Sequence, residues 1–119
     1  MAIKVFDSEL KVMEALWKDG DQTAAQLAKT LKHQVGWNRN TTYTVISKLI
    51  DKGAIMRYGS DFSCKALITK EEVQQSEASE LIGKLFDGSA EVFLSAFISG
   101  AKLSKAEIDS LKHLVEKLK

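Results

Sequence analysis

The hydrophobic residues of this sequence change their spacing at Gly53, and this change limits the folds that the chain can adopt. Before Gly53, apolar residues recur every three or four positions in three segments, as in amphipathic helices. After Gly53 the spacing changes to a period of two, and after a turn at residues 59–61 a half-buried face of Phe62, Cys64, Ala66 and Ile68 alternates with Ser63, Lys65 and Leu67. We therefore predict strands over residues 54–58 and 62–68. Three helices followed by a hairpin form the winged variant of the helix-turn-helix fold.

Each of the three predicted helices has an apolar stripe, and each one ends at a glycine. The helices span residues 8–20, 23–36 and 38–53, and Asp7 or Ser8 is the expected N-cap of the first. The predicted core positions are Leu10, Met13, Leu16 and Trp17 in the first helix, Ala24, Leu27, Ala28 and Leu31 in the second, and Thr42, Val45, Ile46 and Leu49 in the third.

The other side of the third helix is rich in hydroxyl and amide groups, and its single acid, Asp51, lies at the far end. Short hydrogen-bonding side chains on a face with few acids suit the reading of base edges in the major groove of DNA. A polar surface helix is the alternative for this segment in isolation. We predict base contacts from Asn40, Thr41, Tyr43, Thr44, Ser47 and Lys48, and phosphate contacts from Asn38, Arg39, Arg57, Ser60 and Lys65.

Residues 70–119 are predicted to form three further helices with too much apolar surface for a monomer. Capping boxes at Thr69–Glu72 and Ser104–Glu107 begin the first and last of them, and residues 89–98 form the middle helix. The apolar side chains of that middle helix point in nearly every direction, so we expect a partner chain, most simply a second copy. The predicted interface residues are Val92, Phe93, Leu94, Phe97, Ile98, Leu111 and Leu118. We thus divide the chain into a winged-helix DNA-binding domain, residues 1–69, and a helical dimerisation region, residues 70–119.

Charge and composition agree with this division but do not decide it. The net charge of +1 combines +3 over residues 1–69 with −2 over residues 70–119. There is no run of 18 apolar residues, and the opening residues lack the apolar region and cleavage site of a signal peptide. The single cysteine, Cys64, fits a reducing compartment. We expect a cytoplasmic protein without membrane insertion.

The sequence contains no pattern that indicates catalysis. His33 and His113 are expected to be ordinary surface residues, and there is no phosphate-binding loop, metal-ligand spacing or nucleophile motif. We therefore expect neither enzyme activity, nor a cofactor, nor a metal site. Cys64 is interpreted as a small core residue rather than a redox switch. Trp37 either belongs to the core or packs beside the start of the third helix.

Two blocks of the sequence resemble the BlaI/MecI/CopY (penicillinase repressor) family of bacterial transcriptional repressors. The first resembles its recognition-helix block and the second its dimerisation region. The first block consists of Trp37, Asn40-Thr41-Thr42-Tyr43-Thr44-Val45-Ile46-Ser47-Lys48-Leu49 and Asp51-Lys52-Gly53-Ala54-Ile55. The second block consists of Leu81-Ile82-x-Lys84-x-Phe86-Asp87-Gly88-Ser89 and Leu103-Ser104-x-x-Glu107-Ile108-x-x-Leu111.

The resemblance implies a homodimer that binds a palindromic operator in double-stranded DNA and is released by an inducing signal. In the beta-lactam branch of that family, a membrane sensor protease signals release and the repressor is cleaved at an Asn-Phe pair. That pair falls at Ala96 and Phe97 here, so only Phe97 matches. A small ligand that loosens the dimer is the competing mechanism. The paired Cys-x-Cys motifs of the copper branch do not occur in this sequence.

The prediction from the sequence is therefore a homodimeric winged-helix repressor. Its first rival is a winged helix that serves only as a protein-protein adaptor, with no operator. The second rival is an enzyme. Absence of acids over residues 38–48 argues against the adaptor, and absence of a catalytic cluster argues against the enzyme.

Overall fold

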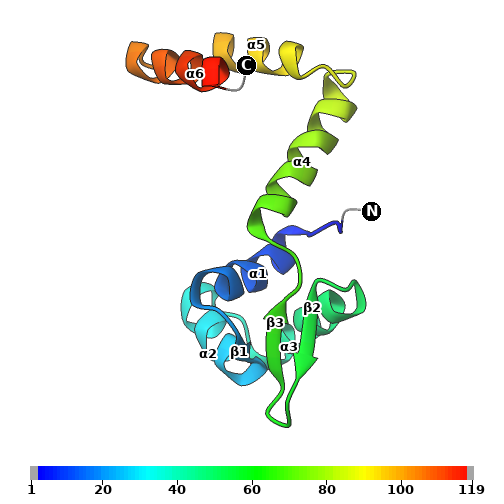
Figure 1. Ribbon diagram of the computed structural model, residues 1–119. Helices are drawn as coiled ribbons and strands as arrows, with labels where there is room; N and C mark the ends of the chain where they lie inside the picture. Colours follow the sequence, from blue (N-terminus) through cyan, green and yellow to red (C-terminus); the bar gives the residue numbers. More distant parts are fainter. Residues whose placement is uncertain (1–2, 118–119) are drawn as a thin grey trace. The chain divides into compact units, whose positions relative to one another are not determined.

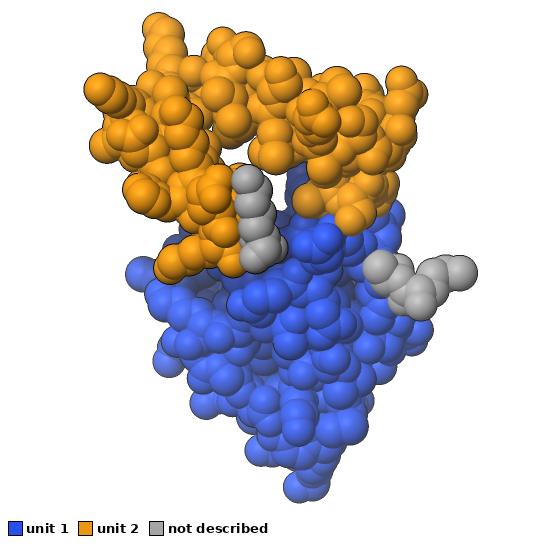
Figure 2. Space-filling model, turned by 45° about the horizontal axis from the view of Figure 1, so that its top comes forward, with its two compact units in different colours: residues 1–77 blue, residues 78–119 orange. Residues whose placement is uncertain are grey.

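The computed structural model describes residues 3–117, which form a mostly helical chain with one small sheet (Figure 1). The chain divides into two compact units, residues 1–77 and residues 78–119 (Figure 2). The elements, in order, are α1 (Asp7–Asp19), β1 (Gln22–Thr23), α2 (Ala24–Val35), α3 (Arg39–Asp51), β2 (Ile55–Tyr58), β3 (Ser63–Ala66), α4 (Lys70–Leu85), α5 (Ala90–Gly100) and α6 (Lys105–Lys117).

The core of the first unit lies between α1, α2, α3 and the hairpin. All four predicted core positions of α2 and all four of α3 are buried, because each stripe falls on one side of its helix. In α1, Met13 and Leu16 are buried while Leu10 and Trp17 are half-buried against them. The winged helix-turn-helix predicted from the change of spacing is therefore confirmed.

The hairpin is shorter than predicted and belongs to a sheet of three strands. β2 pairs with β3 in antiparallel register, with Ile55 opposite Ala66 and Tyr58 opposite Ser63. β1 pairs with the other edge of β3, so the strand order is β1-β3-β2. The sequence did not reveal β1, because two polar residues show no periodicity. This strand joins the first residues of β3 to the segment that directly precedes α2.

The predicted N-cap of α1 is wrong: the helix begins at Asp7, and Phe6 occupies the cap position. The carboxylate of Glu9 accepts a hydrogen bond of 2.9 Å from the backbone N–H of Phe6. Glu9 is buried and also forms an ion pair with the Nζ of Lys52, at the end of α3. The same Nζ donates to the carbonyl of Lys4 and lies 4.3 Å from the centre of the Phe6 ring. Residues 3–6 are thereby attached to the end of α3.

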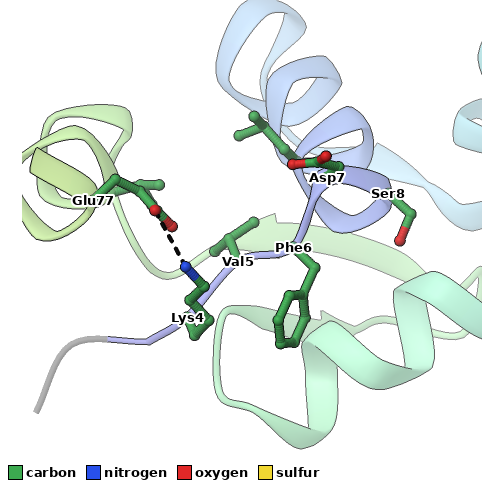
Figure 3. A pocket seen from close by; sticks show the side chains of 8 residues that line it. Lys4, Val5, Phe6, Asp7, Ser8 and Glu77 are labelled. Atoms are coloured by element: carbon green, nitrogen blue, oxygen red, sulfur yellow. Dashed lines mark hydrogen bonds and ion pairs between the residues drawn. The ribbon is translucent and has the colours of Figure 1, made fainter. Parts of the chain in front are cut away.

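The first turns of α4 belong to the first unit. Val73 is buried in its core, and Lys4 forms an ion pair of 3.3 Å with Glu77 (Figure 3). Lys4, Phe6, Val73 and Glu77 are among the residues that line a cavity of about 630 Å³ beside the start of α1. The compact unit thus extends past residue 69, where the sequence places the end of the DNA-binding domain. That functional division stays a prediction.

The second unit is open and apolar within the described residues. No residue of α5 or α6 is buried. The ring of Phe93 packs edge-on against Phe86 and stacks on Phe97, with centroid distances of 5.3 and 6.1 Å. A groove of about 680 Å³ is lined by Phe97, Leu103, Leu111 and neighbouring residues of α6.

Candidate nucleic-acid interface

The exposed face of α3 begins at a capped helix N-terminus. The side-chain oxygen of Asn38 accepts a hydrogen bond of 2.8 Å from the backbone N–H of Thr41. The first turn contains no acid, and the partial positive charge of a helix N-terminus favours an anion such as a phosphate. Asn38, predicted to contact phosphate, therefore also has a structural role, since it holds this end of the helix in place.

Most of the predicted base-reading side chains are exposed on one helix. Asn40, Thr41, Thr44, Ser47 and Lys48 are all exposed, while the opposite side of the helix is buried in the core. A rigid helix that presents short polar side chains in this way has the geometry required for insertion into the major groove. The contacts themselves stay a prediction.

Tyr43 differs from the other predicted base readers, because it is half-buried and already has partners within the protein. The Nη2 of Arg39 donates a hydrogen bond of 3.0 Å to the Oη of Tyr43. The same guanidinium lies over the Tyr43 ring, 5.0 Å from its centre. The spacing of four residues on a helix brings the two side chains together, and this signal was present in the sequence.

The Tyr43 ring contacts the wing, which is the hairpin of β2 and β3 with its turn, residues 55–66. It meets the ring of Phe62 edge-on, with centroids 5.7 Å apart. The guanidinium of Arg57, on β2, lies 3.7 Å from the centre of the Phe62 ring. Phe62 has a positive φ of 55°, and its carbonyl accepts a hydrogen bond of 2.9 Å from the backbone N–H of Ala24. The sequence predicts Phe62 only as the first residue of the second strand, and it does not predict these contacts.

The rest of the wing carries both charges. The predicted phosphate contacts Ser60 and Lys65 are exposed. Asp61, at the turn, accepts a hydrogen bond of 2.8 Å from the hydroxyl of Ser63. The hydroxyl of Tyr58 donates to Asp21 at 2.8 Å, and this bond to a carboxylate raises the pKa of Tyr58. The two acids are thus held by hydroxyl donors on the two sides of the hairpin turn.

The predicted interface residues of the second unit are mostly exposed. Phe93 is half-buried by its ring neighbours, and Ala96 is exposed beside Phe97 on α5. Leu118 lies outside the described residues. The exposed members of the predicted set are Val92, Leu94, Phe97, Ile98 and Leu111.

Within residues 3–117 the structure contains no cluster of side chains able to hold a metal ion. No helix in the same range is both long enough and apolar enough to cross a membrane. The arrangement that remains is a polar helix face beside a hairpin, on a packed three-helix core. Fold and face together define a winged helix-turn-helix protein of the DNA-binding class.

Comparison with known proteins agrees with this class and identifies the family within it. The family model described as "Penicillinase repressor" matches residues 6–117, so the chain belongs to the penicillinase repressor family. It is a DNA-binding transcriptional repressor and not an enzyme. The penicillinase repressor of Bacillus licheniformis is 25% identical over 98% of this chain and 92% of its own length. The methicillin resistance regulatory protein MecI of Staphylococcus aureus is 23% identical over 96% and 94%.

Two solved structures resemble the first unit. The DNA-binding domain of the repressor BlaI superposes with a TM-score of 0.56 and 26% identity, over 60% of this chain and 90% of that one. The monomeric form of Bacillus licheniformis BlaI in complex with the blaP half-operator gives a TM-score of 0.51 and 28% identity, over 58% and 87%.

Proposed function

We propose that the chain represses transcription in the cytoplasm by binding a palindromic operator as a homodimer, from which an inducing signal releases it. The observation that supports operator binding most directly is the exposed polar face of α3, with no acid in its first turn and a capped N-terminus. The exposure of Asn40, Thr41, Thr44, Ser47 and Lys48 on that face supports base reading by these residues. The similarity to a BlaI chain solved with a half-operator supports the same proposal.

The proposal of a homodimer rests on the apolar surface of the second unit. Phe97 and Leu114 are each 55% exposed, and Val92 is 53% exposed. Side chains of this size seldom remain in water as a continuous surface, since burying each one contributes about 1.5–3 kcal/mol. A second copy offers the same surface in return, and the twofold symmetry of such a pair matches a palindromic site.

The experiment that tests the proposal is selection of duplexes from a random-sequence library, followed by titration. The wild-type chain should enrich a palindrome. The triple variant Thr44→Ala/Ser47→Ala/Lys48→Ala should lose about 1–3 kcal/mol of specific affinity per base contact removed while still binding non-specific duplex. Lys11→Ala, which removes an exposed charge from α1, is the matched control and should bind normally. Failure of the wild-type chain to bind any duplex in a salt-dependent way would favour the adaptor function.

Release is proposed to act through α5. Ala96 and Phe97 are exposed on this helix, and cutting there would separate two DNA-binding units that the dimer holds together. Loss of that linkage would weaken binding by as much as about 10²–10⁴-fold. The partner in this proposal is a membrane sensor protease, and the competing mechanism is a small ligand that loosens the dimer. Intact-mass measurement in beta-lactam-treated cells separates them, because derepression with an uncut chain excludes cleavage.

A further inference from the structure

Four side chains form a continuous row from α3 to the wing, which we call the arginine–aromatic cluster: Arg39, Tyr43, Phe62 and Arg57. We propose that Phe62 is a positioning residue for DNA binding, which with Tyr43 holds the two guanidinium groups as a fixed pair for the sugar-phosphate backbone. This inference rests on the proposed function. It adds a residue that contacts no DNA itself and acts through Arg57.

The two arginines are available for an anion. Among the ion pairs of the first unit, one joins Lys4 with Glu77 and another joins Lys52 with Glu9. Within the described residues, no carboxylate forms an ion pair with Arg39 or Arg57. Asp21 and Asp61, which contact side chains of the hairpin, accept hydrogen bonds from Tyr58 and Ser63 instead. Each guanidinium is thus paired with an aromatic ring rather than with a carboxylate.

Stacking against a ring suits an arginine that must bind phosphate. A flat guanidinium that lies on an aromatic face keeps N–H groups at its edge free to donate to phosphate oxygens. The long side chain is also ordered before DNA arrives, so less conformational entropy is lost on binding. Arg57, 3.7 Å from the Phe62 centroid, has this arrangement, and a lysine cannot reproduce it.

Phe62 is itself held firmly enough to act as a support. Its carbonyl accepts the hydrogen bond from Ala24 at the start of α2, and its ring meets Tyr43 edge-on. The next residue, Ser63, pairs with Thr23 of β1 and with Tyr58 of β2. The ring of Phe62 therefore contacts α3, while the backbone of Phe62 belongs to the wing. Shifting it would move Arg57 relative to Arg39.

The same geometry gives Tyr43 a different role from the base reading predicted from the sequence. Because this side chain is half-buried and accepts a hydrogen bond from Arg39, it supports an arginine rather than reaching for a base edge. Tyr43 is therefore placed with Phe62 among the positioning residues. Base reading is left to the exposed residues of α3.

The test is a double-mutant cycle on the full chain, with dissociation constants for a random-sequence duplex of about 30 base pairs, roughly three helical turns. A random duplex suffices because phosphate contacts do not depend on sequence. Phe62→Leu should weaken binding by about 3–10-fold, the range that a partly exposed cation–π contact supports. In an Arg57→Ala background the same change should alter the dissociation constant by less than about twofold, because the Phe62 ring then has no arginine lying on it.

Two further variants sharpen the result. Arg57→Lys keeps the charge but loses the flat group, so it should weaken binding about as much as Phe62→Leu while leaving the salt slope unchanged. Phe6→Leu is the matched control: it removes another ring that contacts a cation, Lys52, outside the cluster, and should bind normally. Additive effects of Phe62→Leu and Arg57→Ala, or wild-type binding by Arg57→Lys, would overturn the proposal.

A second cycle covers the case in which Phe62→Leu does not fold. Tyr43→Phe keeps the ring and removes only the acceptor for Arg39, so it should weaken binding in the wild-type background and have no effect in an Arg39→Ala background. Equal effects in both backgrounds would contradict the inference. Absence of salt-dependent binding by the wild-type chain would instead contradict the proposed function, so the two failures are distinguishable.

Discussion

At the scale of single residues, Thr42 lies in the middle of the buried side of α3. Its Oγ1 is inaccessible to water, and within the described part of the chain no hydrogen-bond partner lies within reach. An unsatisfied buried hydroxyl costs about 1–3 kcal/mol, and valine has nearly the same shape without it. We expect Thr42→Val to raise the free energy of unfolding by about 1 kcal/mol in urea titrations. Thr42→Ser, which keeps the hydroxyl and loses the methyl group, should lower it. A loss of stability in Thr42→Val would show that the hydroxyl is bonded in solution.

Cys64 makes the unfolding of the protein sensitive to alkaline pH. Burial of the side chain raises the pKa of the thiol from 9.0 to about 11, despite the opposing effect of Arg57. As the pH rises, the unfolded chain therefore loses this proton before the folded chain does. Stability should fall between pH 9 and pH 11 and be unaffected by this group below pH 9. Urea titrations across that range should show a smaller fall for Cys64→Ala than for the wild-type chain. Equal falls in the two proteins would exclude this cause.

Individual residues were predictable where a local pattern places them. The stripe of α3 needs only the helical period, so Thr42 and Leu49 could be assigned to the core from the sequence. The partner of Glu9 could not, because Lys52 lies 43 residues away and nothing local links them. Phe62 was missed for a similar reason. Its contact with Tyr43 depends on how the hairpin folds back onto α3.

At the scale of elements, the boundary of the first unit is set by α4 rather than by the hairpin. Capping signals predicted where α4 begins, and the hydrogen bonds between Thr69 and Glu72 agree with them. Such signals say nothing about what a helix packs against. Val73 is buried in the core of the first unit, and this depends on contacts with residues distant in sequence. The same limit applies to β1, whose two residues are recognisable only by their pairing with β3.

This boundary predicts how the chain tolerates truncation. A protein of residues 1–77 should be more stable than one of residues 1–69 by about 2 kcal/mol, because only the longer one buries Val73. Within residues 1–77, Val73→Ala should destabilise by about 1–2 kcal/mol. Gln74→Ala, at an exposed position, is the matched control and should leave stability unchanged. Equal urea midpoints for the two truncated proteins would contradict this assignment.

At the scale of the whole molecule, the second unit decides the state of assembly. We expect sedimentation of the full chain to give a dimer at micromolar concentration, and Phe97→Glu to give a monomer. A carboxylate buried at an interface without a partner costs several kcal/mol. Lys117→Glu, which introduces the same group at the exposed end of α6, should remain a dimer. Sedimentation of the wild-type chain as a monomer would exclude the proposed homodimer.

The exposed apolar surface of α5 and α6 also bears on how much of this protein a cell must contain. In the proposed dimer, association follows mass action, so at low abundance a twofold fall in chain number lowers the amount of dimer by about fourfold. Occupancy of a palindromic site would then respond to synthesis and dilution more steeply than it would for a monomeric repressor. Cell growth and division alone, without any inducer, would shift the threshold at which the regulated genes are expressed.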